Sequence, residues 1–325
     1  DFYYNRSESG FEDVNALYHL TAFHDHIASL GYDTLMKVGV TVDTHGMLGA
    51  DNSAFNRNGG SPTLDFGTGG VDDAEDADVI IHEYSHGLSW SANGNDNFNN
   101  ARSGLDEGLA DYFAMSYSRA LNPFGWEKIF SWDGHNEFWG GRTATTPNNY
   151  PAGANIYAVG EIWNAAMSAI YTDLGQIVAD KLMLESMHFF TNTTALSEAA
   201  VYVLQSDTLL FAAAHAATIC NRFQSKNILT VNCTPSSTED LLKPAAPIAI
   251  SNSYGFSFLN EDLEIVFDQS ASGQLALYDI AGQKVRDLHF KNSKKIALSP
   301  EDLAAGIYIL NIRTEHAQLS IKLSK

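Results

Sequence analysis

The sequence has few basic residues and no long apolar run. Its 325 residues include 19 Lys and Arg against 39 Asp and Glu, for a formal net charge of -20. This excess of negative charge argues against nucleic acid or an anionic membrane surface as a partner. No apolar stretch approaches the roughly 20 residues that a transmembrane helix needs. The chain also begins without an initiator Met or a signal peptide, so we expect a processed or truncated start.

Cysteine is equally scarce, with only Cys220 and Cys233 in the whole chain. A zinc site built on this pair would lack two further ligands nearby. In a secreted protein a local disulfide is the expected pairing, and two free thiols are the alternative.

The chain is long enough for two domains, and its 45% hydrophobic content supports a sizeable core. Pro, Ser and Thr concentrate in "TPSSTEDLLKPAAP", which separates two regions of different pattern. We predict a first domain at residues 1–234, a linker at 235–247 and a second domain at 248–325. Up to Pro247 the chain has 11 basic and 30 acidic residues, and after it 8 and 9, so the acidity belongs to the first domain.

Periodicity indicates an α+β protein. In the first domain, apolar residues recur at helical spacing and predict helices near residues 16–30, 76–91, 105–121, 156–173, 177–190 and 197–223. Strand-like runs such as "MKVGVTVD" and "TLDFGTG" occur only before Val71. After Pro247, short alternating runs separated by turn residues predict a small all-β sandwich. The first domain is therefore a short sheet lobe, which could be truncated, followed by a helical lobe.

The segment "DVIIHEYSHGL" places polar side chains inside an apolar run. His82 and His86 are one helical turn apart, so both imidazoles can point at one place, with Glu83 beside them. In this HExxH pattern the two histidines bind one zinc ion, and the glutamate handles the proton of a bound water. The pattern alone arises by chance often enough to require a third ligand.

A second helical pattern, "SGLDEGLADYFA", offers that ligand. Glu107 and Asp111 lie one turn apart on a common face, and a helix antiparallel to the first could bring Glu107 to the metal. Two imidazoles and a carboxylate complete the three protein ligands of a catalytic zinc site. Asp111 is placed to accept the outer N–H of a ligand histidine, which we expect to be His82.

These two motifs together resemble the thermolysin-like zinc metallopeptidases with a glutamate third ligand, and most closely the fungalysin branch. The stretches "SLGYDTLMKVGVTVD", "GADNSAF", "LDFGTGGVDDAEDADVIIHEYSHGLS" and "YAVGEIWNAAM" resemble that branch in order and spacing, over most of residues 11–230. The resemblance implies a zinc endopeptidase that acts on proteins or peptides, with one zinc per chain. The roles that it implies are metal ligation by His82, His86 and Glu107, general acid–base catalysis by Glu83, and support of the metal site by Asp111.

The resemblance also implies a substrate-binding edge strand, whose backbone pairs with the substrate backbone. This strand is the stretch "NSAF", formed by Asn52, Ser53, Ala54 and Phe55.

Two positions depart from the family pattern. Where the family has an oxyanion-binding histidine, this chain has Tyr157, whose phenol can donate the same hydrogen bond but carries no positive charge. His135, in the loop "SWDGHNEFWGGR", is the alternative donor. Phe98 stands where a thermolysin-type tyrosine is expected. These departures favour a second hypothesis, a zinc-containing binding or adhesion protein with weakened catalysis, whereas the intact Glu83 favours the enzyme.

The acidic run "VDDAEDAD" raises the question of calcium, since the family uses an aspartate equivalent to Asp78 in a calcium cluster. The downstream partners of that cluster are missing from this chain. The alternative is that these carboxylates favour the positive end of the following helix.

Residues 248–325 resemble the sorting tail recognised by the type IX secretion system of certain gram-negative bacteria. The likeness is carried by "LALYDIAGQKV", "LSPEDLAAGIYILNI" and the terminal "LSIKLSK". It implies a secreted or cell-surface protein and the type IX machinery as a partner. The alternative is a carbohydrate-binding domain, for which only Tyr278 and Tyr308 could form an aromatic platform.

Overall fold

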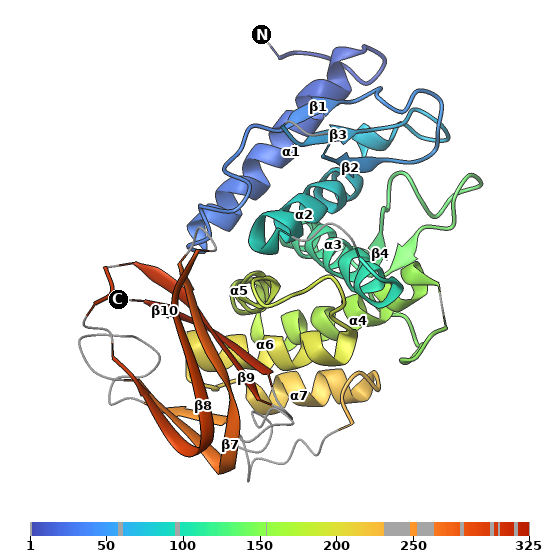
Figure 1. Ribbon diagram of the computed structural model, residues 1–325. Coiled ribbons are helices and arrows are strands. Elements are labelled where there is room, and N and C mark those ends of the chain that lie inside the picture. Colours follow the sequence, from blue (N-terminus) through green and yellow to red (C-terminus); the bar gives the residue numbers. More distant parts are fainter. Residues whose placement is uncertain are drawn as a thin grey trace. The chain divides into compact units, whose positions relative to one another are not determined.

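The computed structural model describes residues 2–57, 61–94, 98–153, 155–230, 248–251, 263–279, 283–299, 302–304, 306–314 and 318–324 (Figure 1). The chain divides into two compact units, Asp1–Thr234 and Pro235–Lys325. The expected linker, residues 235–247, lies outside the described residues. Among the helices that the structure describes, none is long and apolar enough to cross a membrane.

The first unit joins a small sheet to a set of helices. Its strands are β1 (Thr41–Asp43), β2 (Ala54–Asn56), β3 (Thr63–Asp65), β4 (Lys128–Ile129) and β5 (Arg142–Thr143). Its helices are α1 (Gly10–Ser29), η1 (Asp73–Glu75), α2 (Ala77–Asn93), α3 (Asn100–Leu121), α4 (Ile156–Leu174), α5 (Gln176–Met187), α6 (Leu196–Phe211) and α7 (Ala216–Ser225). The three-stranded sheet lies beside α1 and α2, whereas α4 and α5 lie beyond α3 (Figure 1).

The sheet leaves β2 at an edge. β3 is central, because it pairs in parallel with β1 and antiparallel with β2. A strand at an edge keeps one side of its backbone free for another chain. The stretch "NSAF" therefore runs into an edge strand, with Ala54 and Phe55 inside β2 and Asn52 and Ser53 directly before it.

Polar side chains begin the three central helices of this unit. Asp76 accepts a hydrogen bond from the Asp78 N–H at 2.7 Å, which satisfies one free donor at the start of α2. Asn99 and Asn155 cap α3 and α4 in the same way. α2 ends at Gly94, whose φ of 70° is a left-handed conformation that glycine adopts without strain.

α3 and α4 cross with their backbones close together. A Cβ atom at Gly108 of α3 would lie 2.7 Å from the Gly160 carbonyl oxygen of α4 and 2.8 Å from Trp163 Cβ. Such distances leave room only for a hydrogen, so glycine is required at this crossing. A Cβ at Gly160 would in turn lie 3.0 Å from Glu107 Cβ. The crossing therefore fixes the start of α4 beside Glu107.

Several element bounds differ from the sequence-based expectation. The helix predicted at 197–223 is two helices, because Ala212 and Ala213 have φ of 51° and 62° and break the chain between α6 and α7. α3 begins earlier than residue 105, at the cap supplied by Asn99. β4 and β5 were not expected, since two-residue strands carry no periodic pattern.

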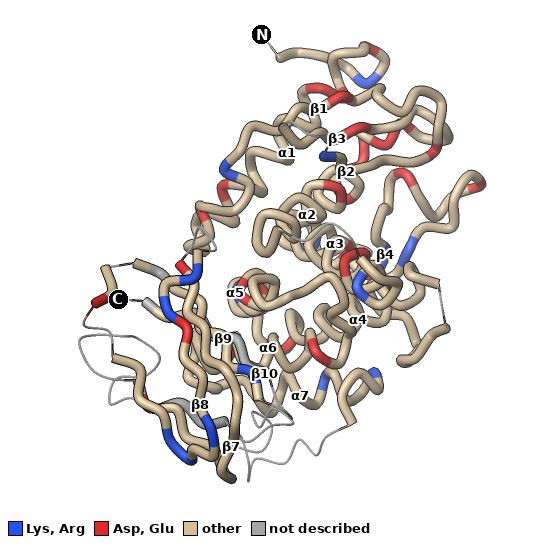
Figure 2. Tube along the Cα trace, viewed as in Figure 1, with Lys and Arg blue, Asp and Glu red and all other residues tan. Residues whose placement is uncertain are grey.

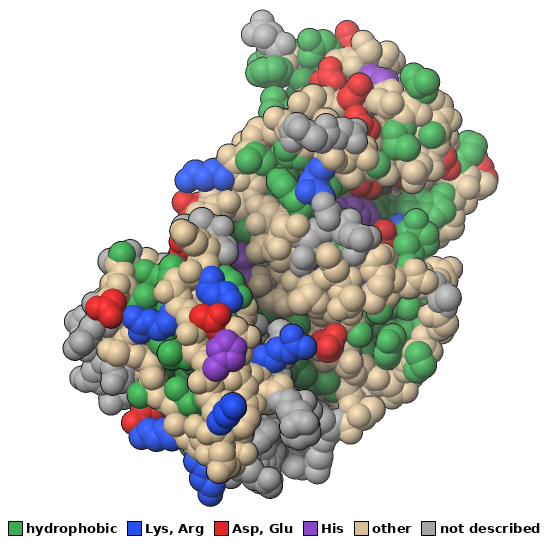
Figure 3. All heavy atoms as spheres, in the orientation of Figure 1, with side chains coloured by type: hydrophobic (Ala, Val, Ile, Leu, Met, Phe, Trp, Pro, Cys, Tyr) green, Lys and Arg blue, Asp and Glu red, His purple; other side chains and the backbone are tan. Residues whose placement is uncertain are grey.

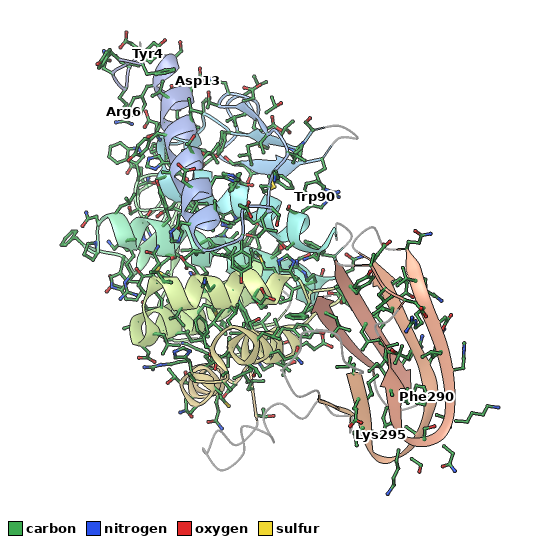
Figure 4. All side chains as sticks on the ribbon, turned by 90° about the vertical axis from the view of Figure 1, so that its left-hand side faces the viewer. Tyr4, Arg6, Asp13, Trp90, Phe290 and Lys295 are labelled. Carbon is green, nitrogen blue, oxygen red and sulfur yellow. The ribbon has the colours of Figure 1, made fainter. Side chains whose placement is uncertain are left out.

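The second unit is all β, as expected. It contains β6 (Ile248–Ser251), β7 (Leu263–Asp279), β8 (Lys284–Leu298), β9 (Ile307–Thr314) and β10 (Gln318–Ser324). The first half of β7 pairs with β6 and the second half with β9, while β8 follows β7 along both halves with register shifts near the middle. The strands are therefore longer than the short runs suggested. Apolar residues from both halves, including Phe290, share one core (Figure 4).

The predicted disulfide cannot be followed in full. Cys220 is fully buried in α7, and Cys233 lies outside the described residues. The pairing therefore stays a prediction.

The helix crossing gives a test of the fold. We expect Gly108→Ala to destabilise the first unit by about 1 to 3 kcal/mol, because the added methyl group overlaps α4. Urea unfolding of the full chain, followed by far-ultraviolet circular dichroism, measures this loss. Gly39→Ala is the matched control, since a Cβ at the exposed Gly39 meets no atom within 4 Å. Equal unfolding midpoints for the two variants would contradict the tight crossing.

Candidate active site

Three side chains from two helices converge in the first unit. His82 and His86 project from α2 and Glu107 projects from α3, and one ligand atom of each lies within 4.8 Å of the others. The two imidazole Nε2 atoms are 3.2 Å apart. Glu107 Oε2 lies 3.4 Å from His82 Nε2, and Oε1 lies 4.0 Å from His86 Nε2. The structure thus brings the three expected ligands together.

The outer nitrogen of each histidine faces a carboxylate. Nδ1 of His86 lies 2.6 Å from Asp106 Oδ2, and Nδ1 of His82 lies 2.9 Å from Asp111 Oδ1, although this second contact is not well aligned for a hydrogen bond. Such partners hold a proton on Nδ1 and direct the Nε2 atoms of the two rings toward one another. Two Nε2 atoms that face each other at 3.2 Å need a proton or a cation between them, so this arrangement fits a metal ion that would take the place of a proton.

Asp106 is a part of the site that the sequence reasoning missed. Its other oxygen accepts hydrogen bonds from Ser89 at 2.6 Å and from the fully buried Arg102 at 2.8 Å. Arg102 also lies 4.2 Å above the Phe98 ring. The sequence feature that could have identified Asp106 is its position directly before Glu107, on a face of α3 that packs against α2. Phe98 therefore packs against Arg102, which holds Asp106 and through it His86. Phe98 does not line the cavity of this site, which is described below.

Charge compensation around the three ligands is strong. Burial alone would raise the pKa of Glu107, but His82, His86 and Arg142 outweigh it and lower that pKa to about 2. The pKa of Asp106 is also lowered to about 2, because Arg102 and His86 outweigh its burial. Burial lowers the pKa of His82, yet Asp111 and Glu107 raise it to about 10. Both carboxylates are ionised at neutral pH and attract a cation.

Arg142 is the second residue that the sequence reasoning missed. It begins β5, and its Nη1 lies 3.1 Å from Glu107 Oε2 and 2.7 Å from Asp111 Oδ1. Its guanidinium also lies 4.5 Å from the centre of the Tyr157 ring. Nothing in the sequence of the loop "SWDGHNEFWGGR" marks this arginine as a site residue. Only the pairing of β4 with β5 brings it to Glu107 and Asp111 of α3.

One cavity of about 430 Å³ reaches this site, and His82 is the proposed ligand that lines it. His82, Glu83, Arg142 and Tyr157 all line it, with Glu83 largely buried and Tyr157 48% exposed. Histidine atoms are visible at the bottom of a hollow on the face shown in Figure 3, with acidic and basic atoms beside them. A buried carboxylate beside the two histidines that also lines a cavity can exchange a proton with a water molecule there.

The predicted edge strand reaches the same cavity. Asn52 and Ser53 line it, whereas Phe55 turns away and packs against Gly87 and Trp90 of α2. Trp90 is labelled near the end of α2 in Figure 4. Asn52 and Ser53 therefore face the cavity, whereas Phe55 holds the strand on α2.

The structure does not support His135 as the alternative oxyanion donor. Its Nε2 lies 3.1 Å from the carbonyl oxygens of both Ile129 and Arg142, so the ring is engaged with backbone. Its φ is 58°, and the residue does not line the cavity described above. His135 instead joins the two ends of the loop between β4 and β5.

The acidic residues at the start of α2 satisfy local groups rather than the calcium cluster considered for Asp78. Asp78 is buried, and its two oxygens accept hydrogen bonds from the Ser118 hydroxyl and the Phe130 N–H. Asp76 caps α2 and accepts from the N–H groups of Trp132 and Asp133. Calcium at Asp78 is therefore unsupported, and the expected helix-start role describes these two residues.

Comparisons with known proteins agree with this geometry. No curated protein matches the chain. The precursor of protealysin, a metalloproteinase from Serratia proteamaculans, is similar in structure over 70% of this chain and 81% of that chain, with a TM-score of 0.52 and 13% identity. At this identity the likeness shows the fold alone.

Two further solved structures are more distant. The M60 catalytic domain of ZmpC from Clostridium perfringens covers 94% of this chain and 62% of its own, with a TM-score of 0.35 and 9% identity. A DUF3244 family protein from Bacteroides vulgatus, with an immunoglobulin-like β-sandwich fold, covers 25% and 85%, with a TM-score of 0.22 and 19% identity. Neither score carries an argument about fold.

The C-terminal part matches a family directly. Residues 259–325 match the secretion system C-terminal sorting domain. The expected resemblance of the tail is therefore confirmed. The chain combines a unit that shares its fold with the protealysin precursor and a secretion system C-terminal sorting domain, which makes it a secreted or cell-surface protein.

Proposed function

We propose that the first unit is a zinc-dependent endopeptidase that hydrolyses peptide bonds in proteins or peptides outside the cell. The observation that carries this proposal is the convergence of two imidazole Nε2 atoms and the Glu107 carboxylate beside Glu83, at an open cavity. His82, His86 and Glu107 would hold the zinc, which when bound acidifies a water molecule and polarises the substrate carbonyl.

Glu83 is the proton carrier of the proposed reaction. It follows His82 directly on α2 and lines the cavity, so its carboxylate can reach a water molecule that approaches the metal ligands. It accepts the proton of the attacking water and then delivers it to the nitrogen of the leaving amine. The same group thus acts first as a base and then as an acid.

Tyr157 and Arg142 share the task of oxyanion stabilisation. Tyr157 offers a phenolic hydrogen bond from the first turn of α4, and Arg142 supplies the positive charge that a phenol lacks. Together they offer the hydrogen bond and the charge that an imidazolium would provide.

The substrate backbone would lie along β2. Asn52 and Ser53 line the cavity on the approach to this edge strand, so an extended peptide could pair there and pass its scissile carbonyl over the metal ligands. Pairing of this kind recognises main chain rather than one particular side chain. We therefore propose protein or peptide substrates, with the sorting domain directing the enzyme to the type IX machinery.

A binding or adhesion protein with weakened catalysis is the alternative. Phe98 no longer favours it, because Phe98 packs on Arg102 outside the cavity. A purely structural zinc site is closed by four protein ligands, whereas the described site has three and opens onto the cavity that contains Glu83. The enzyme is thus the better-supported function.

Removal of the third ligand should abolish tight metal binding. We expect Glu107→Ala to retain far less than one zinc per chain after dialysis, because the two histidines alone do not complete the site. Metal analysis of the purified full chain measures this. Glu127→Ala, which removes an exposed glutamate outside the cavity, should keep its zinc. Full zinc retention by Glu107→Ala would show that the ligand assignment is wrong.

Removal of the proposed base should separate metal binding from turnover. Glu83→Gln is nearly isosteric but cannot accept a proton at neutral pH, so we expect zinc to be retained and casein hydrolysis to fall by about 100-fold to 10,000-fold. Hydrolysis by the unmodified protein, with and without a zinc chelator, provides the reference rate. An unchanged rate in Glu83→Gln would exclude the proposed base.

The oxyanion role of Tyr157 has its own test. Tyr157→Phe removes only the hydroxyl, so a true donor should lower kcat by about 100-fold to 1,000-fold with little change in KM. The control is Tyr18→Phe, an exposed tyrosine on α1 outside the cavity. A fall of less than about threefold would leave Arg142 as the oxyanion-binding group, since a lost transition-state bond costs far more.

A further inference from the structure

A second group of carboxylates lies in the wall of the same cavity. Asp51 precedes β2, Asp73 begins η1, and Asp133 lies in the loop between β4 and β5, so three separate segments contribute. One oxygen of each lies within 4.8 Å of the others. Figure 2 shows that acidic residues gather around β1, β2 and β3, the part of the unit to which Asp51 and Asp73 belong.

Two of the three carboxylates are buried and incompletely bonded. Asp73 is 2% exposed and Asp133 is 4% exposed. The Oδ1 atom of each has no hydrogen-bond partner among the described residues, whereas Asp73 Oδ2 accepts from the Ser53 hydroxyl at 2.5 Å. Buried carboxylate oxygens are costly unless a donor or a cation satisfies them. Both side chains nevertheless line the cavity, so a ligand can reach them.

The charges in this group oppose one another. Burial, followed by the neighbouring Asp51 and Glu83, raises the pKa of Asp73 to about 6. Burial, followed by Asp73, Asp51 and Asp76, raises the pKa of Asp133 to about 7. No ion pair among the described residues reaches any of the three. The cluster therefore has negative charge that no described Lys, Arg or His offsets.

The other acidic groups nearby are compensated differently. In the cluster of Glu12, Asp72 and Glu75, the guanidinium of Arg6 donates to both Glu75 oxygens at 2.8 Å. Figure 4 labels Arg6 beside the N-terminal end of α1. Asp76 and Asp78 are instead satisfied by backbone N–H groups and a hydroxyl. Among the acidic clusters described here, the group of Asp51, Asp73 and Asp133 is therefore the one that no Lys, Arg or His reaches and in which two buried carboxylate oxygens have no donor.

We propose that Asp51, Asp73 and Asp133 bind a divalent cation of the calcium class, separate from the metal held by the two histidines. Calcium prefers six to eight oxygen ligands at about 2.3 to 2.6 Å, so a single ion can touch oxygens that are up to 4.8 Å apart. Water from the open cavity would complete its coordination. The absence of histidine or cysteine from the group favours a hard cation over zinc.

The bound cation would join the three segments that shape the cavity. Asp51 lies in the segment directly before the edge strand β2, and Asp133 belongs to the loop that leads to Arg142. A cation brought only by a basic substrate side chain would leave the buried pair of Asp73 and Asp133 uncompensated in the resting protein. A resident ion removes that repulsion permanently, which is why we assign the cluster to a metal ion rather than to a substrate ammonium group.

Calcium titration of the full chain tests this assignment. The Glu83→Gln variant is used throughout to prevent self-digestion, and calcium is removed on a chelating resin while zinc content is held equal by metal analysis. We expect calcium to raise the melting temperature by about 5 to 10 °C at roughly 100 times its dissociation constant. Terbium, a luminescent calcium substitute, should bind once per chain at this site, with emission excited through Trp139 in the same cavity and reversed by calcium.

Matched variants locate the site. Asp133→Asn and, at the exposed position, Asp51→Asn should lose most of the calcium-dependent shift and the terbium signal. Asp25→Asn, which removes an exposed charge on α1, should keep both.

Three outcomes would overturn the proposal. One is an unchanged melting temperature of the parent protein with calcium. A second is a calcium response that survives in both cluster variants. The third outcome concerns Asp133→Asn in the catalytically intact chain, without the Glu83 substitution. If this variant lost cleavage beside Lys or Arg whether or not calcium was present, the cluster would bind a basic substrate side chain. None of these outcomes depends on whether zinc binds to His82 and His86.

Discussion

The 3.2 Å approach of the two histidine Nε2 atoms is the interaction on which the first unit is organised. This approach requires that each ring is fixed through its Nδ1 atom, and Asp106 and Asp111 of α3 face these two atoms. Those aspartates are positioned in turn by the buried Arg102 and by Arg142. The three proposed metal ligands thus lie at the centre of a charge network that runs from α2 through α3 to β5.

Backbone approach gives this network its geometry. Gly108 and Gly160 let α3 and α4 cross without intervening side chains, which puts the first turn of α4 next to Glu107. Tyr157 lies in that turn, so its placement at the cavity follows from two absent side chains rather than from its own contacts. Backbone packing beside Glu107 therefore determines which residue of α4 lines the cavity.

Carboxylates serve three distinct purposes in this acidic unit. Asp76 and Asp78 hold the start of α2 and the backbone of the loop after β4. Asp106 and Glu107 balance histidine and arginine around the metal ligands. The group around Asp73 and Asp133 is left with unsatisfied oxygens at the cavity wall. Part of the negative charge of this unit therefore lies in the interior, where donors from the chain or cations must offset it.

The sequence by itself determined the elements whose signal is local. Helical spacing places His82 and His86 on one face with Glu83 beside them, and Glu107 with Asp111 on a face of another helix. The change in composition at residues 235–247 indicates two units. Only the tertiary structure decided the roles of Asp106, Arg102 and Arg142. No periodic pattern in the sequence indicates which partner a single aspartate or arginine contacts in the folded chain. It also decided against His135, whose ring turns back to its own loop backbone. The physical reason is common to all four residues: spacing along the chain fixes which face of an element a side chain occupies, whereas the packing of one element on another fixes what that face touches.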